Sequence, residues 1–319
     1  MLEKKVAILM STYNGQRYLN EQIISIVNQT YGNWHLYIRD DGSKDNTQLM
    51  IREWERKLPD KITFFNKENV KNIGVVKSFM DIFSNVNAEF YMFSDQDDVW
   101  KKDKIEKSVN AMLSQEYTKR PICIHTDLQV VNSKLEGNEV MNGDKIWHDF
   151  QHLLFSNCIT GCTMLINQVV KDMIDFENIN YTRVYMHDWW IGLICAEFGQ
   201  IVYLKEPLIL YRQHGDNVVG SYKKNTIRHL IYRATHQVPE RKHMRRVISI
   251  ASEFDKFYGN KMSGKNRSYV HEYGKLTNSA NFLGDLLLGM RLVPQRMSPK
   301  GKIFFTYLMT VYNKDLKGL

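Results

Sequence analysis

The chain has 319 residues, of which 43% are hydrophobic and 24% are charged. A chain of this length can form one large α/β domain with an appendage, or two modest domains. No run of about 18 consecutive apolar residues occurs, which argues against a membrane-spanning helix. The first apolar run, Val6 to Met10, is shorter than the roughly 7–15 residues of a signal peptide's hydrophobic region. We therefore expect an intracellular protein that begins with a buried strand.

The first hundred residues alternate between short apolar runs and helical patterns. Strands are expected at 5–10, 34–39, 61–66 and 89–94, and helices at 17–31, 43–58 and 73–86. Ser43 or Asp45 is a plausible cap for the second of these helices. This β-α-β-α-β-α-β order predicts an α/β fold with a mainly parallel central sheet flanked by helices. Ligands of such sheets bind beyond the carboxyl ends of the strands.

The pattern loosens after Lys101. Further strands are expected at 122–125, 128–132 and 163–166, followed by a helix at 188–198. Strand character returns from Gln200, and we expect Pro207 to break it. Helical patterns then fill most of the remainder, at 227–238, 243–258, 281–293 and 302–312. We expect the boundary between the two parts near residues 220–225.

The two parts differ in charge. Residues 221–319 contain 19 Lys or Arg and 6 Asp or Glu, whereas residues 1–220 contain 24 and 29. A basic region of this kind favours a polyanionic partner, such as nucleic acid, anionic lipid or a phosphorylated substrate. The alternative is a helical surface that only contacts solvent.

The four cysteines, Cys123, Cys158, Cys162 and Cys195, match no zinc or disulfide framework. Cys158 and Cys162 are four residues apart, but no second pair of cysteines or histidines lies nearby in the sequence. We expect them to be small apolar residues in a reducing compartment.

Three carboxylates follow the fourth expected strand, in the run "SDQDD". Asp95, Asp97 and Asp98 repel one another unless they share protons or bind a cation. Oxygen ligands suit Mg²⁺ or Mn²⁺, which commonly join protein carboxylates to substrate phosphates. The alternative is a helix start, with Asp98 or Asp103 as the cap, although a cap does not explain all three acids.

Two further polar motifs follow the first and second strands. The hydroxyl and amide groups of "STYNG" can bind a nucleotide's base or ribose, and Asp40 or Asp41 of "RDDGS" can accept the imide N–H of uracil or thymine. Each motif can also be a simple turn, because Asn14-Gly15 is a common turn pair.

Two motifs in the later part can carry chemistry. The run "MHDWW" places Asp188 beside tryptophans, whose apolar surroundings would raise its pKa and improve it as a general base. Its alternative role is helix N-cap. The run "YRQHGDN" offers Arg212 and His214, which can grip a diphosphate or bind a metal, or can belong to a plain surface loop.

Together, these motifs resemble the family 2 glycosyltransferases with the GT-A fold. The matching runs span residues 6–220 and are, in order, "STYNG", "RDDGSKDNT", "NIG", "FSDQDDVW", "HDWW" and "RQHGDN". The runs "SDQDDVW" and "IRDDGS" look most like the rhamnosyltransferase branch, whose members build bacterial cell-wall and capsular polysaccharides. Membrane-embedded synthases of the family carry a Q-x-x-R-W motif that is missing here, which favours single addition or a short polymer.

The resemblance implies a division into a catalytic GT-A domain at 1–222 and a basic helical region at 223–319. Within the first, residues 1–100 would bind the nucleotide sugar and residues 101–222 the acceptor. Asp188 would be the catalytic base, at the place of the family's E/H-D motif, where many relatives have Glu at the position of His187. The other implied roles are nucleotide binding by Thr12, Tyr13, Asn14, Asp40, Asp41, Asn72 and Asp95; metal binding by Asp95, Asp97 and His214; diphosphate binding by Arg212 and His214; and acceptor binding by His187, Trp189 and Trp190.

The implied reaction is inverting transfer of a sugar from a nucleotide diphosphate to a hydroxyl of a glycan or lipid-diphosphate-linked acceptor, with Mn²⁺ or Mg²⁺ as cofactor. The branch favours dTDP-rhamnose, and UDP sugars are the alternative donors. The basic region would hold the enzyme on the inner membrane surface or form a homodimer. A nucleotidyltransferase and a nucleic-acid-binding protein are the competing classes, and both explain the motifs less well. The first usually needs a Gly-rich loop with Lys or Arg, and the acidic cluster of this chain would repel nucleic acid.

Overall fold

The computed structural model describes residues 4–213, 238–276, 282–293 and 299–311. The chain divides into two compact units. The first contains Met1–Ile146, Cys158–Asn178 and Met186–Gly220, and the second contains Trp147–Asn157, Ile179–Tyr185 and Ser221–Leu319. Two short segments from the predicted catalytic domain thus belong to the second unit. The single boundary at residue 222 stays a prediction.

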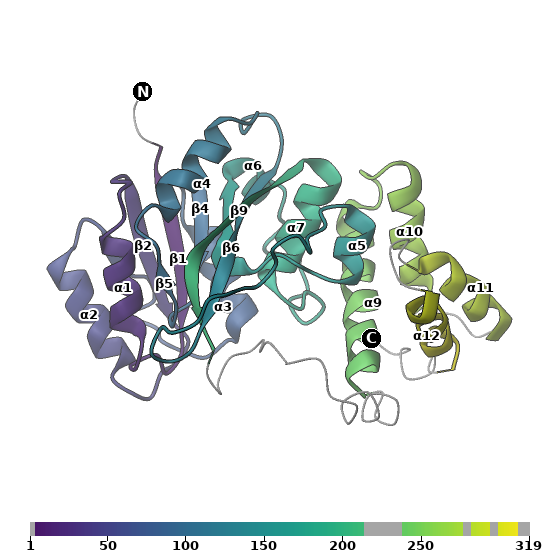
Figure 1. The fold of residues 1–319 in the computed structure, drawn as a ribbon, viewed down its shortest axis with the longest axis horizontal. Coiled ribbons are helices and arrows are strands. Elements are labelled where there is room, and N and C mark those ends of the chain that lie inside the picture. The colour runs from purple at the N-terminus through teal and green to yellow at the C-terminus, as the bar shows by residue number, and fades with distance from the viewer. Residues whose placement is uncertain (1–3, 214–237, 277–281, 294–298, 312–319) are drawn as a thin grey trace. The chain divides into compact units, whose positions relative to one another are not determined.

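The first unit is built on a nine-stranded sheet with the order β3-β2-β1-β4-β8-β6-β9-β5, and β7 pairs with β6. Figure 1 labels β1, β2, β4, β5, β6 and β9 of this sheet. The pairs β3/β2, β2/β1, β1/β4 and β6/β9 are parallel, and the others are antiparallel. The strands are β1 (Val6–Thr12), β2 (Trp34–Asp40), β3 (Ile62–Phe64), β4 (Phe90–Ser94), β5 (Val99–Trp100), β6 (Ile122–Val131), β7 (Glu139–Val140), β8 (Met164–Asn167) and β9 (Gln200–Arg212).

Helices cover both faces of this sheet. They are α1 (Leu19–Val27), α2 (Thr47–Lys57), α3 (Val75–Asn85), α4 (Lys104–Leu113), α6 (Gln168–Asp172) and α7 (His187–Phe198), with the 3₁₀ turn η1 (Gly161–Thr163) before β8. Alternate residues of β1 and β2 form one core with α1, α2 and α4. On the opposite face, Phe79 and Phe83 of α3 pack edge-on against Phe93 of β4. The predicted α/β architecture is confirmed.

Four local expectations are wrong. One strand, β6 at Ile122–Val131, replaces the two that were expected between 122 and 132. Pro207 does not break β9, because it lies opposite Asp127 at a shift in the β6/β9 register, where a ladder hydrogen bond is not required. Helix α2 has Asn46 as its N-cap, and Asp45 instead accepts the Thr47 N–H. Of the two acids expected as a helix cap, Asp98 starts no helix, because β5 follows it, whereas Asp103 is confirmed as the N-cap of α4.

The second unit is helical. It contains α5 (Phe150–Phe155), α9 (Val238–Tyr258), α10 (Gly264–Lys275), α11 (Phe282–Leu292) and α12 (Pro299–Val311). Helix α9 buries an apolar face in which the ring of Phe254 contacts Phe150 of α5. The helix predicted at 227–238 lies almost wholly outside the described residues. In the part of the chain that the structure describes, no helix has the length and apolar character needed to span a bilayer.

Candidate active site

The polar motifs meet at one edge of the sheet. Strands β2, β1 and β4 are parallel neighbours, with Thr12 opposite Asp40 and Met10 opposite Ser94. The segments that follow these strands therefore leave the sheet side by side. This is the carboxyl edge at which parallel sheets bind their ligands, and it carries "STYNG", "RDDGS" and the acid cluster.

Asp40 organises the turn that follows β2. It is fully buried, and its carboxylate accepts hydrogen bonds from Thr12 Oγ1 at 3.0 Å, Ser43 N at 2.8 Å and Gly42 N at 3.1 Å. Thr12 is likewise buried. To bind a nucleotide as predicted, the side chains of Thr12 and Asp40 would have to replace these hydrogen bonds by bonds to the ligand.

Asp41 organises the segment before α3. Its Oδ1 accepts the Ile73 N–H at 2.8 Å and its Oδ2 accepts the Gly74 N–H at 3.0 Å. Asn72 is exposed, and its Nδ2 donates to the Asp41 carbonyl at 2.8 Å. The buried guanidinium of Arg39 pairs with Asp41 and with Asp81, each at 2.9 Å. Sequence reasoning assigned no role to Arg39, which holds this edge together.

Replacing Arg39 by Met should destabilise the protein by about 3 kcal/mol, because the buried Asp41 carboxylate would lose its only ion-pair partner among the described residues. Urea unfolding at pH 7 measures the effect. Lys67→Met is the matched control, since the Lys67–Glu55 pair is partly exposed and contributes about 0–1 kcal/mol. Equal midpoints for the two variants would contradict the expectation.

The loop after β1 presents Tyr13, whose side chain is 47% exposed, together with Asn14. Asn14 has a left-handed backbone conformation with φ of 48°, and its N–H donates to Ser43 Oγ at 2.8 Å. Residues 95–98, which we call the acid loop, contact this loop through Gln96. Its Oε1 accepts the Tyr13 N–H at 2.9 Å, and its Nε2 donates to the Tyr13 carbonyl at 3.0 Å. Of the predicted nucleotide-binding residues, Tyr13, Asn14 and Asn72 are thus the exposed ones.

The acid loop brings together a different set from the predicted pair of Asp95 and Asp97. One ligand atom from each of Asp95, Asp98 and Cys162 lies within 4.8 Å of the others. Burial, then the nearby charges of Asp97 and Asp188, raises the pKa of Asp95 to about 7. Burial, with the charges of Asp95 and Asp97, raises the pKa of Asp98 well above its ordinary range.

This cluster fits a hard divalent cation through its oxygens. Asp98 is buried, and its Oδ2 has no hydrogen-bond partner among the described residues. A cation at that oxygen would offset the repulsion that raises the pKa values of the acids. Burial raises the pKa of the Cys162 thiol well above its ordinary value, so Cys162 is a neutral S–H donor to the acids rather than a thiolate ligand.

The candidate base, Asp188, lies in the first turn of α7 and is buried. Its Oδ2 accepts the Gly161 N–H at 2.9 Å. Burial raises the pKa of Asp188 to about 7, although this hydrogen bond opposes the shift. The alternative role of N-cap is wrong, because Met186 holds that position.

The three neighbours of Asp188 in its motif are covered by protein. His187 stacks against Phe79 and Phe93, with ring centroids 4.3 and 4.7 Å away, and burial lowers its pKa to about 3. Trp189 and Trp190 are buried as well. The aromatic wall predicted to face an acceptor is therefore internal in this structure, and the acceptor role of these residues stays a prediction.

The guanidinium of Arg212 is buried and bonded to protein, and its role in binding a diphosphate stays a prediction. Its Nε donates to the Asp97 carbonyl at 2.9 Å, its other nitrogens reach the Ser133 carbonyl and Glu21 Oε2, and its plane lies over Tyr18. Its backbone N–H donates to Asp98 Oδ1 at 3.1 Å. Arg212 therefore positions the acid loop. His214, the other predicted diphosphate and metal residue, lies outside the described residues.

Turn η1 contacts both the candidate base and the acid loop, and the sequence did not predict this. Gly161 binds Asp188, and the next residue, Cys162, joins the acid cluster. The run "TGCT" contains only small residues before a strand, which gives no distinctive sequence signal.

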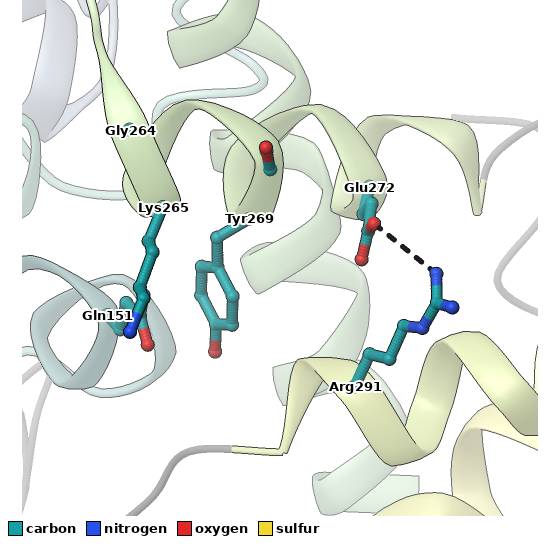
Figure 2. Close-up of a pocket in the computed structure, with 7 residues that line it drawn as sticks. Gln151, Gly264, Lys265, Tyr269, Glu272 and Arg291 are labelled. Carbon is teal, nitrogen blue, oxygen red and sulfur yellow. Dashed lines mark ion pairs between the residues drawn. The ribbon is translucent and has the colours of Figure 1, made fainter.

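A separate hollow of about 440 Å³ lies in the second unit (Figure 2). It contains none of the predicted site residues and is lined by Gln151, Gly264, Lys265, Ser268, Tyr269, Glu272 and Arg291. Glu272 and Arg291 pair with each other at 3.8 Å, and the Tyr269 hydroxyl donates to the Leu292 carbonyl at 2.8 Å. The carboxyl edge of the sheet remains the stronger candidate.

Comparison with known proteins identifies the family of this chain. Residues 7–172 match the family model of glycosyl transferase family 2. The dTDP-rhamnosyl transferase RfbG of Shigella flexneri is 28% identical over 95% of this chain and 99% of its own length. The UDP-Glc:alpha-D-GlcNAc-diphosphoundecaprenol beta-1,3-glucosyltransferase WfgD of Escherichia coli is 24% identical over 59% of this chain and 69% of its own length.

A solved structure shows the same fold. The crystal structure of Staphylococcus aureus TarS residues 1–349 in complex with UDP matches 98% of this chain and 88% of that chain, with a TM-score of 0.59 and 13% identity. At this identity the likeness establishes the GT-A-like α/β fold with its helical C-terminal region, and nothing finer.

Proposed function

This chain belongs to glycosyltransferase family 2 and is a nucleotide-sugar-dependent glycosyltransferase of polysaccharide biosynthesis, and from that premise we propose that it is an inverting, metal-dependent enzyme with Asp188 as its base. The observation that carries the proposal is the position of Asp188. It is a buried carboxylate with a pKa of about 7, close enough to the acid cluster to raise the pKa of Asp95. A base with that pKa is half deprotonated at neutral pH.

In the proposed reaction, an acceptor hydroxyl gives its proton to the Asp188 carboxylate as its oxygen attacks the sugar's C1. The bond from C1 to the donor's phosphate oxygen breaks, and the nucleoside diphosphate leaves with that electron pair. Attack from the opposite face inverts the anomeric centre, so no covalent enzyme intermediate is needed. The Gly161 N–H donates to one oxygen of Asp188 and so helps to orient the carboxylate that would accept the proton.

Asp95 and Asp98, with Asp97 at the same loop, would hold Mn²⁺ or Mg²⁺, which when bound supplies positive charge to the departing diphosphate. Cys162 lies beside these acids as a neutral thiol. The metal role of His214 stays part of the proposal.

For the donor we propose dTDP-rhamnose, supported by the similarity to RfbG along 95% of the chain. UDP sugars are the alternative, in line with the names of WfgD and the TarS complex. Thymine and uracil present the same imide group, so the residues of the base site do not separate the two. The exposed Tyr13, Asn14 and Asn72 are the first contacts to test.

For the acceptor we propose a hydroxyl of a glycan linked to a lipid diphosphate, by analogy with the substrate in the name of WfgD. The enzyme would then work in the cytoplasm at the inner face of the cell membrane. A homodimer formed through the basic region is the alternative role of that part of the chain.

A donor panel tests the function. The protein is incubated with Mn²⁺ and dTDP-rhamnose, UDP-glucose, UDP-galactose or UDP-GlcNAc, and release of nucleoside diphosphate is measured. We expect one donor to be consumed, with at least a 100-fold loss in Asp95→Asn and loss on chelation. Release of inorganic diphosphate from a nucleoside triphosphate would identify a nucleotidyltransferase instead, and no metal dependence would contradict the metal assignment.

A further inference from the structure

Helices α11 and α12 of the second unit present an unusual set of exposed apolar side chains. Five of the large apolar residues on these two helices are between 43% and 73% exposed: Leu283, Leu287, Met290, Ile303 and Tyr307. The spacings of i, i+4 and i+7 on α11, and of i and i+4 on α12, place each set along one side of its helix. We call these five residues the apolar face.

The exposure is not the result of loose packing. The two helices approach closely at Gly289, where a methyl group would lie 3.2 Å from Met309 Cβ. Phe305, Leu308 and Met309 of α12 are buried, as is Leu292 of α11. Each helix thus has a buried side that holds the fold and an exposed side that is also apolar.

Charge decides between the candidate occupants of this face. Residues 221–319 carry 19 basic and 6 acidic residues. Arg291, one position after Met290, has a side chain that is 71% exposed, and it extends from α11 as Figure 2 shows. A second copy would bring two strongly basic regions together, which is unfavourable. An anionic bilayer offers both hydrocarbon for the apolar face and negative charge for the basic residues.

We propose that the apolar face of α11 and α12 inserts into the headgroup region of an anionic lipid bilayer, to which the net positive charge of residues 221–319 attracts the protein. The proposal rests on the proposed function, because it explains how a chain with no spanning helix in its described part would reach a lipid-linked acceptor. Insertion of this kind is shallow, about 5–10 Å deep.

Vesicle flotation of the full chain tests the surface. We expect the protein to float with vesicles of phosphatidylcholine and phosphatidylglycerol, and to dissociate as salt is raised. The double variant Leu287→Asp Ile303→Asp should bind at least 10-fold more weakly. Leu49→Asp is the matched control, because Leu49 is a comparably exposed apolar residue on α2 of the first unit. This variant should bind vesicles like the parent.

Three outcomes would overturn the proposal: equal binding to pure phosphatidylcholine vesicles, equal loss in Leu49→Asp, or no flotation together with a dimer in sedimentation that the double variant abolishes. Donor hydrolysis without vesicles separates this proposal from the proposed function. Normal hydrolysis with no lipid binding would reject the surface alone, whereas lipid binding without any donor consumption would reject the transferase.

Discussion

Replacing Asp188 by Asn is expected to lower kcat by about 10²–10⁴-fold, the range that general base catalysis contributes. The Asn side chain keeps an oxygen that can accept the Gly161 N–H, so the local geometry should survive. What disappears is the ability to take a proton. The dissociation constant of the nucleoside diphosphate, measured by fluorescence titration, should change by less than 3-fold.

The pH dependence gives a second readout. Because the folded-state pKa of Asp188 is raised to about 7, the parent should gain activity as pH rises through 7, when the carboxylate loses its proton. The same shift means that ionising this buried acid weakens the folded state as pH rises from about 4 towards 7. Asp188→Asn removes that penalty, so its melting temperature at pH 8 should equal or exceed that of the parent. A stable variant with near-normal turnover would refute the base assignment.

The sequence predicted the sheet because its signals are local. Apolar runs that end in polar residues fix the strand ends, and parallel pairing then brings Thr12, Asp40 and Ser94 to one edge. The position of the catalytic candidate followed from the same logic, since an Asp beside tryptophans at a helix start is bound to be shielded from water. These features depend on residue type and spacing, which a sequence displays directly.

The details that the sequence did not show depend on partners distant along the chain. Arg212 looked like a free cation, but Glu21 and the carbonyls of Asp97 and Ser133, far from it along the chain, occupy its guanidinium. Asp98 remained an alternative to Asp103 as a helix cap, because the two-residue strand β5 between them is too short to recognise in the sequence. Cys162 was expected to be only a small apolar residue, because its acidic neighbours Asp95 and Asp98 lie more than 60 positions earlier in the sequence.

Gly161 is the sharpest test of the arrangement, because its role follows only from close approach. A methyl group at this position would lie 2.7 Å from His187 Nε2 and 3.5 Å from Asp188 Cβ. His187 has little room to retreat, since it packs between Phe79 and Phe93. Gly161→Ala should therefore displace the N–H that holds Asp188, and we expect a 10- to 100-fold loss of kcat, of the order that a 1 Å misplacement causes.

The shape of the pH profile distinguishes positioning from general damage. Losing the Gly161 hydrogen bond removes an interaction that lowers the pKa of Asp188, so the rising limb of the profile should move to higher pH in Gly161→Ala. Gly274→Ala is the matched control, because the nearest atoms to its added methyl lie at 4.0 Å and its profile should match that of the parent. The double variant Gly161→Ala His187→Ala should regain activity relative to Gly161→Ala, since removing the ring makes room for the methyl. An unchanged limb in Gly161→Ala, or no recovery in the double variant, would mean that the turn merely fills space and that Asp188 is positioned by other contacts.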